Sequence, residues 1–151
     1  QYDGQEEPYV IFFLDPADAE EALQVASAND SEWAGAHLSV VNLGAALKLC
    51  ERSQAEPPRC KIQGPQEAYD DAKEEVLDKL RAQNIEPGDW LLPVYCSDGF
   101  QSDGMFPLFF SKEDLNAGWV RSGQSEDDAM FLTTTVMDIR SLLVNMEHTD
   151  A

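Results

Sequence analysis

The feature that most constrains the fold is an apolar run followed by a helix start, which occurs twice at a spacing of 96 residues. The run at 10–14 (VIFFL) is followed by Asp15, and the run at 106–110 (FPLFF) is followed by Ser111. Asp and Ser are preferred just before the first turn of a helix, because their side-chain oxygens accept hydrogen bonds from backbone N–H groups there. Each pair therefore predicts a buried strand followed by a capped helix.

The same spacing extends to a second strand and a second helix. Residues 37–41 (HLSVV) and 131–136 (FLTTTV) have the composition of strands. Asn42 and Asp138 follow these runs, and each is expected to begin a helix whose apolar residues lie on one face. A capped amphipathic helix is common by chance, but one spacing that aligns four elements indicates an internal duplication.

These patterns predict an α/β fold in a single domain over residues 9–147, with repeat units at 9–53 and 105–147. Each unit is a strand–helix–strand–helix sequence, and residues 66–96 add a helix and a strand between the units. We therefore expect one mixed sheet of about five strands with helices packed on it. The proline-rich residues 51–65 are expected to form a long loop.

The two ends of the chain are expected to lie outside this domain, as an acidic arm at 1–8 and a short tail at 148–151. No apolar stretch approaches the roughly 18 residues of a membrane span, so we expect no transmembrane segment. No cleavable targeting segment is recognisable, so we expect any such segment to lie outside the sequence given.

The balance of charge indicates the kind of partner. The chain carries 29 Asp and Glu against 10 Lys and Arg, a formal net charge of −19. A field of this sign repels nucleic-acid phosphates and anionic lipid headgroups and attracts basic surfaces. We therefore expect protein partners with basic surfaces and no nucleic acid. The alternative is that the charge serves only solubility.

The sequence offers no recognisable constellation for catalysis. Only two histidines exist, His37 at the start of an expected strand and His148 in the tail. Glycine loops for nucleotides, a nucleophile elbow and zinc-ligand spacings are missing. We expect no enzymatic activity, no cofactor and no metal. A hydrolase with an unfamiliar site is the least favoured alternative, since only the abundance of carboxylates supports it.

The three cysteines, Cys50, Cys60 and Cys96, form no CxxC pair, which excludes a zinc ribbon and a thioredoxin-type motif. We expect thiols, because Cys50 falls on the apolar face of a helix, where cysteine usually acts as a small hydrophobic residue. A Cys50–Cys60 disulfide is the alternative.

Four residues are candidate contacts with a protein partner: Phe100, Trp33, Asp98 and Asp103. Phe100 lies in a turn-rich loop, and it either anchors a partner or folds back onto the core. Trp33 covers a helix end or contacts a partner. Asp98 and Asp103, together with Ser102, have oxygens that suit calcium, but the loop lacks the spacing of an EF-hand and its two Asp-Gly turns explain these residues.

Several of these elements also carry a family resemblance. Two strand-to-helix segments read VIFFLDPADAEEAL and FPLFFSKEDLNAGW, two others read LSVVNLGAAL and TTTVMDIRSLL, and PVY at 93–95 forms part of a further strand. With these segments, which together span about 10–147, the chain resembles the Tic22-like family of plastid and cyanobacterial proteins.

The resemblance implies a pseudo-twofold α/β domain with grooves. It also implies a plastid protein, soluble or peripheral to the envelope or thylakoid membrane, with a non-enzymatic role as an import-translocon or chaperone-like component. The alternative is a peripheral soluble subunit docked on a thylakoid photosynthetic complex such as photosystem I.

Overall fold

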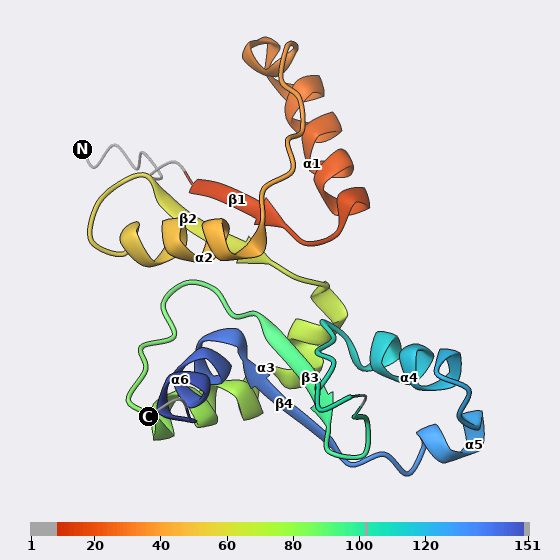
Figure 1. Ribbon diagram of the computed structural model, residues 1–151. Coiled ribbons are helices and arrows are strands. Elements are labelled where there is room, and N and C mark those ends of the chain that lie inside the picture. The colour runs from red at the N-terminus through yellow and green to blue at the C-terminus, as the bar shows by residue number, and fades with distance from the viewer. Residues whose placement is uncertain (1–8, 102, 150–151) are drawn as a thin grey trace. The chain divides into compact units, whose positions relative to one another are not determined.

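The computed structural model describes residues 9–101 and 103–149, and the chain is mixed α/β (Figure 1). Contacts within the chain divide it into two compact units, Gln1–Gln63 and Gly64–Ala151, which we call unit 1 and unit 2. The sequence predicts one domain over residues 9–147.

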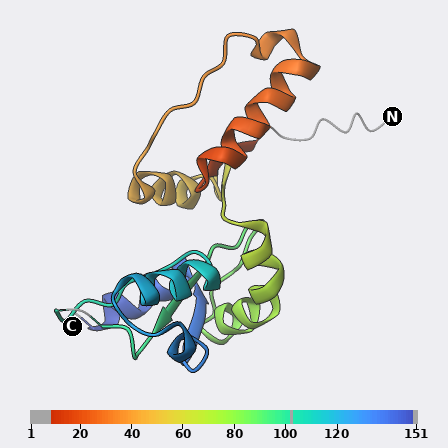
Figure 2. The ribbon, with the colours of Figure 1, turned by 90° about the vertical axis from the view of Figure 1, so that its right-hand side faces the viewer.

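Unit 1 consists of a two-stranded parallel sheet and three helices. Its elements are β1 (Tyr9–Phe13), α1 (Pro16–Asn29), the 3-10 helix η1 (Ser31–Trp33), α2 (Leu43–Arg52) and β2 (Arg59–Gln63). In the register of β1 and β2, Phe12 lies opposite Ile62. Between η1 and α2 the chain has no helix or strand, and Figure 2 shows this connection as a long segment that joins the two.

The helix starts of unit 1 are confirmed, and local chemistry explains them. The Asp15 carboxylate accepts a hydrogen bond of 2.8 Å from the Ala17 N–H, and Pro16 occupies the first position of α1. The Asn42 side chain accepts one of 2.7 Å from the Ala45 N–H at the start of α2. The predicted apolar face of α2 is confirmed as well, since its residues Ala46 and Cys50 are buried.

Unit 2 contains a two-stranded antiparallel sheet and four helices. Its elements are α3 (Gln66–Ala82), β3 (Pro93–Ser97), α4 (Lys112–Arg121), α5 (Glu126–Ala129), β4 (Thr134–Asp138) and α6 (Ile139–Thr149). Tyr95 of β3 lies opposite Val136 of β4. The Ser111 hydroxyl accepts a hydrogen bond of 3.0 Å from the Asp114 N–H, which confirms the predicted start of α4.

The core of unit 2 forms where one face of α3 meets the sheet and α4. One face of α3 is apolar at helical spacing, and its residues Ala72, Val76 and Leu80 are buried. They pack in one cluster with Tyr95 and Leu115. Burying side chains such as Val76, Leu80 and Leu115 contributes about 1.5–3 kcal/mol each. This burial offsets the like-charge repulsion on the exposed acidic face of α3.

The predicted single mixed sheet of about five strands is wrong, because the described strands form two separate sheets, β1–β2 and β3–β4. Residues 37–41 form no strand. Residues 106–110 contribute one antiparallel bridge, between Phe109 and Tyr95, instead of a full strand. Pro107 lies within this segment and has no N–H group to donate to a ladder.

The predicted loop at 51–65 is also wrong in part, because β2 lies inside it. Prolines flank this short strand at Pro58 and Pro65, and they favoured the prediction of a loop. The strand is held instead by parallel pairing with β1, about 50 residues earlier in the chain. Such a distant partner leaves no local signature in the sequence.

The structure does not support the internal duplication. The helices keep the predicted spacing, since α1 and α4, and likewise α2 and α6, start at equivalent positions. The strands do not, because β1 pairs in parallel with β2 whereas β3 pairs antiparallel with β4. The two units therefore have capped amphipathic helices at matching positions, but their sheets differ in strand direction.

The ends of the chain need one correction. Helix α6 continues to Thr149, so His148 belongs to the helix and not to a tail that starts at 148. The predicted acidic arm at 1–8 lies outside the described residues.

Candidate functional site

Unit 1 contains an open groove with a volume of about 560 Å³, which we call the unit 1 groove. It is lined by β1, the first turn of α1, the segment 37–41, the start of α2 and one residue of β2. The lining residues are Ile11, Phe12, Phe13, Leu14, Pro16, Ala19, His37, Leu38, Ser39, Val40, Val41, Leu43, Ala46 and Ile62.

Local interactions place the walls of this groove. The Leu14 N–H donates a hydrogen bond of 3.0 Å to the Gln63 carbonyl, which extends the pairing of β1 and β2 past the end of β1. The cap at Asp15 then turns the chain into α1, and this brings Pro16 into the groove wall. On the other side, the cap at Asn42 starts α2 and places Leu43 in the wall.

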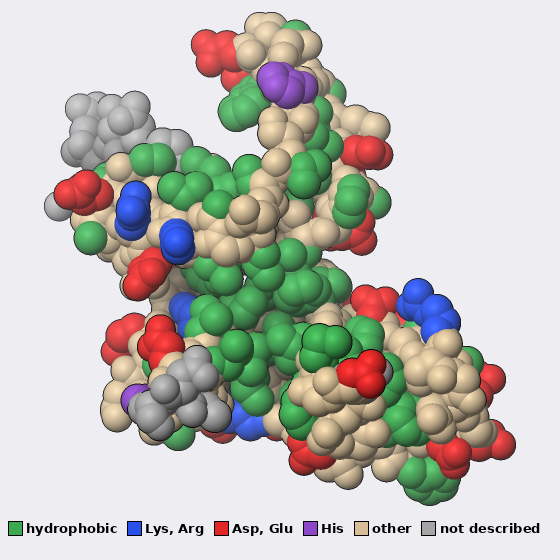
Figure 3. Space-filling view, viewed as in Figure 1, with side chains coloured by type: hydrophobic (Ala, Val, Ile, Leu, Met, Phe, Trp, Pro, Cys, Tyr) green, Lys and Arg blue, Asp and Glu red, His purple; other side chains and the backbone are tan. Residues whose placement is uncertain are grey.

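The chemistry of the groove is almost entirely apolar. Only His37 and Ser39 among the lining residues carry polar side chains. Hydrophobic side chains are prominent on the visible face of unit 1 (Figure 3). A concave site of a few hundred cubic ångströms with few polar groups is typical of a site for apolar ligands. This lining suits the binding of apolar side chains better than proton transfer.

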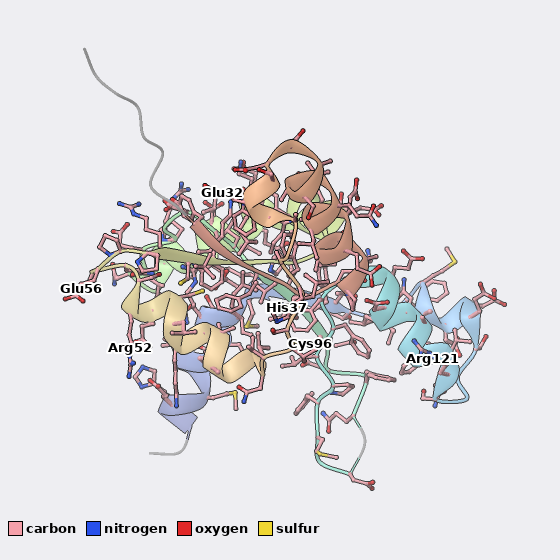
Figure 4. All side chains as sticks on the ribbon, turned by 90° about the horizontal axis from the view of Figure 1, so that it is seen from above. Glu32, His37, Arg52, Glu56, Cys96 and Arg121 are labelled. Carbon is pink, nitrogen blue, oxygen red and sulfur yellow. The ribbon has the colours of Figure 1, made fainter. Side chains whose placement is uncertain are left out.

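The segment 37–41 forms one wall and has an unusual backbone. Its five residues make no backbone or side-chain hydrogen bond with any other residue in the described part of the chain. Val40 is fully exposed at 102%, and Leu38 and Val41 are exposed as well. Figure 4 labels His37, the first residue of this segment, and Glu32 in the short helix before it. The sequence predicted a paired strand here, but the segment pairs with none of residues 9–101 and 103–149.

The four predicted contact residues are distributed over both units. Trp33 is exposed in η1 of unit 1, and its carbonyl accepts a hydrogen bond of 3.2 Å from the Ser27 hydroxyl. Asp98 and Asp103 are exposed in the loop after β3. Their contact with a partner, like that of Trp33, stays a prediction. Ser102, named with them for calcium, lies outside the described residues.

The fourth residue, Phe100, folds back onto unit 2, which is one of the two interpretations that the sequence left open. Its ring lies 5.7 Å from that of Phe109 and 5.6 Å from that of Trp119, measured between centroids. Both pairs are tilted, which is a favourable arrangement of aromatic rings. Gly118 makes room for this cluster, since a Cβ atom there would lie 2.7 Å from the Phe109 ring.

Unit 2 also buries one carboxylate, that of Asp138, which is fully enclosed. Its oxygens accept hydrogen bonds from the Leu92 N–H at 2.9 Å and from the Arg140 Nε at 2.7 Å. The Arg140 guanidinium also donates to the carbonyls of Pro87 and Trp90 and stacks on the Trp90 ring. Since these partners use both oxygens, Asp138 and Arg140 tie the 87–92 connection to α6 and do not form an acid–base site.

Two groups of β3 titrate away from their ordinary values. Burial raises the pKa of the Tyr95 hydroxyl, and the carboxylates of Asp71 and Glu75 raise it further. Burial also raises the pKa of the Cys96 thiol; Asp98 adds to this effect and Lys79 opposes it. A raised pKa keeps both groups protonated near neutral pH, so neither is an activated nucleophile.

The described residues were also compared with the requirements of a metal site and of a membrane span. They contain no group of three or more His, Cys, Asp or Glu side chains arranged to hold a metal ion. None of their helices is long and apolar enough to cross a membrane. The cysteines are thiols, as the sequence predicted. Figure 4 labels Cys96 and shows Arg52 and Glu56 near the end of α2.

Comparison of the chain with models of protein families, with curated proteins and with solved structures found no match. Function is therefore inferred from the geometry of unit 1. The family resemblance implied grooves but did not place this one, although one signal in the sequence pointed toward it. Residues 37–41 have the composition of a strand, and no sequence feature identified which element would pair with them.

Proposed function

We propose that this protein is a non-catalytic binding protein that holds apolar segments of other polypeptides in the unit 1 groove. One observation carries the proposal: the open groove of about 560 Å³ is lined by apolar side chains apart from His37 and Ser39. Exposed apolar surface of this kind is typical of sites that bind another protein or an apolar ligand.

The size of the groove sets the expected affinity. Burying one Leu or Val side chain contributes about 1.5–3 kcal/mol, and a groove of this volume accommodates two or three of them. Association itself costs several kcal/mol, because the two molecules lose translational and rotational freedom. The apolar contacts alone therefore correspond to a dissociation constant of about 1 mM or weaker, which suits transient holding of a polypeptide better than permanent assembly.

The resemblance to the Tic22-like family supports a location and a role for this activity. A component of plastid protein import, or a chaperone-like protein, has to hold polypeptides that expose apolar segments. The strong negative charge of −19 supports the same role, since it attracts polypeptides rich in Lys and Arg. We accordingly propose a plastid protein that binds polypeptides in transit.

Fluorescence anisotropy with the full chain tests this function. The probe is a fluorescein-labelled peptide in which Leu alternates with Lys. We expect binding that Val40→Asp weakens about tenfold or more, because a charge enters the apolar wall. Val40 is fully exposed, so this change leaves the fold intact. The matched control Val25→Asp alters an exposed residue of α1 outside the groove and is expected to bind like the wild type.

Two results would overturn the proposal. One is the absence of binding up to about 5 mM protein, which is above the dissociation constant that the apolar contacts alone give. The other is equal weakening by Val40→Asp and Val25→Asp, since this would show that binding does not use the groove.

A second candidate is a peripheral subunit docked on a larger complex, such as photosystem I in the thylakoid. An exposed pair in unit 2 favours it: Met130 and Phe131 are 83% and 84% exposed. They directly follow the acidic helix α5, which holds Glu126, Asp127 and Asp128. Aromatic and Met side chains beside such charges suit an interface with a basic partner.

Native fractionation of extracts from the source organism tests this candidate. We expect the chain to migrate with a large assembly and Phe131→Ala to release it. A chain that migrates only as a free monomer would rule the candidate out.

A further inference from the structure

The wall of the unit 1 groove offers hydrogen-bonding groups in addition to apolar surface. The backbone N–H and C=O groups of residues 37–41 have no hydrogen-bond partner in the described chain. Backbone groups in folded proteins are almost always paired, with water taking the place of a protein partner at exposed positions. A run of unpaired groups with the composition of a strand is a template for another strand.

We propose that this segment binds its partner by strand addition, and that the partner is an extended stretch of a cationic polypeptide in which apolar residues alternate with Lys or Arg. The inference rests on the proposed function, and it adds the mode of binding and the chemistry of the partner. In strand addition, main-chain hydrogen bonds give affinity and pockets for alternate side chains give specificity.

Strand geometry explains why the partner alternates. Successive side chains of a strand point to opposite faces, so every second residue of an added strand faces the groove. The side chains that face the groove meet Leu38, Val41 and the Phe residues of β1, and they have to be apolar. The intervening side chains point toward solvent and stay charged.

The charges around the groove explain why the partner is cationic. Pro16 and Ala19 of α1 line the groove, and the acidic residues Asp15, Asp18 and Glu20 stand beside them in the same two turns. No Lys or Arg lines the groove. Residues 9–63 carry eight Asp and Glu against four Lys and Arg, so unit 1 attracts cations overall.

A second copy of this chain is a poorer occupant. Two chains that each carry −19 repel one another, and strand pairing between two identical segments 37–41 supplies no positive charge. The charge therefore favours a basic polypeptide over self-association.

The decisive experiment uses the Leu–Lys peptide, the full chain and two methylated versions of the peptide. In a strand, alternate N–H groups point to the same edge. One version carries N-methyl groups on one alternate set of residues, and the other version carries them on the remaining set. We expect one set to weaken binding about tenfold or more and the other set to leave it nearly unchanged. Equal affinity of both versions, or an equal loss for both, would overturn strand addition.

Substitutions in the chain provide an independent test. Ser39→Pro removes one backbone N–H group from the segment, whereas Ser39→Ala removes only the hydroxyl. We expect Ser39→Pro to weaken binding several-fold more than Ser39→Ala. Equal affinities of the two variants would show that the backbone of the segment does not pair with the peptide.

The outcomes separate this inference from the proposed function. If Val40→Asp weakens binding of the Leu–Lys peptide but both methylated versions bind with equal affinity, the groove binds polypeptides without strand pairing, and only the further inference is wrong. If no peptide binds, both the further inference and the proposed function are wrong. A peptide with Glu in place of Lys is expected not to bind, and its binding at equal strength would refute the cationic partner. Sedimentation velocity that shows a dimer lost in Val40→Asp would favour a second copy instead.

Discussion

Replacing Asp138 with Ala is expected to destabilise unit 2 strongly, because this buried carboxylate joins parts of the unit that lie far apart in the sequence. Its two oxygens accept hydrogen bonds from the N–H groups of Leu92 and Arg140, both at 2.9 Å. They also accept from the Arg140 guanidinium, at 2.7 Å from Nε and 3.2 Å from Nη2. The variant loses all four bonds together.

The structure gives the size of the effect. An unpaired buried N–H group at Leu92 costs about 1–3 kcal/mol. Loss of the cap on α6 costs about 1 kcal/mol. The Arg140 side chain is only 15% exposed, so its charge loses its main partner in a poorly hydrated place. The guanidinium keeps its bonds to the carbonyls of Pro87 and Trp90, which limits the loss. We expect a decrease of about 3–5 kcal/mol in the free energy of unfolding.

Urea unfolding followed by tryptophan fluorescence measures this change. In a Trp33→Phe background, both remaining tryptophans, Trp90 and Trp119, belong to unit 2. The matched control is Asp78→Ala, which removes an ion pair with Arg81 at 3.3 Å on the surface of α3. Both partners are mostly exposed, so we expect a change within about 0.5 kcal/mol.

A loss below about 1 kcal/mol in Asp138→Ala would show that this carboxylate contributes little to the stability of unit 2. Such a result would mean that water reaches the carboxylate, or that the connection before β3 does not depend on it.

Three further predictions concern unit 2. Because the pKa of Tyr95 is raised in the folded protein, the Tyr95 hydroxyl loses its proton first in the unfolded chain, and stability decreases as pH rises above about 10. We expect a shallower decrease in Tyr95→Phe, measured by thermal unfolding between about pH 9 and 11. The raised pKa of Cys96 predicts slower alkylation by iodoacetamide at pH 8 in the folded protein than in urea, followed by mass spectrometry, and equal rates would contradict it. Gly118→Ala places a methyl group 2.7 Å from the Phe109 ring, and we expect it to lower the free energy of unfolding in urea by about 1–3 kcal/mol. The control Gly35→Ala meets nothing within 4 Å and is expected to be neutral or slightly stabilising.

The helices were predictable from the sequence because their signals are local. Asp15, Asn42 and Ser111 each cap the helix that they were expected to cap, through hydrogen bonds to N–H groups two or three residues later. The apolar stripe of α3 likewise repeats at helical spacing and faces the core. These features depend on neighbours along the chain, so a single sequence contains them.

The sheets were not predictable in the same way, because a strand is defined by a partner. The segment 37–41 has strand-like composition but pairs with no other described residue, whereas β2 has a less typical sequence and pairs with β1 over its whole length. Composition alone does not distinguish the two cases. The unit 1 groove depends on the same distant pairing, so its position and lining could not be predicted, although the family resemblance implied grooves.

Hydrogen–deuterium exchange of the amides at 38–41 tests whether this segment is open in the free protein and pairs with a bound peptide. We expect rapid exchange in the free protein, because these N–H groups have no partner among the described residues, and slower exchange when the Leu–Lys peptide is bound. Amides of the paired strand β2 serve as the internal reference and are expected to be slower than those of 38–41 in the free protein. Strong protection of 38–41 without peptide, or exchange unchanged by saturating peptide, would show that this segment does not bind by strand addition.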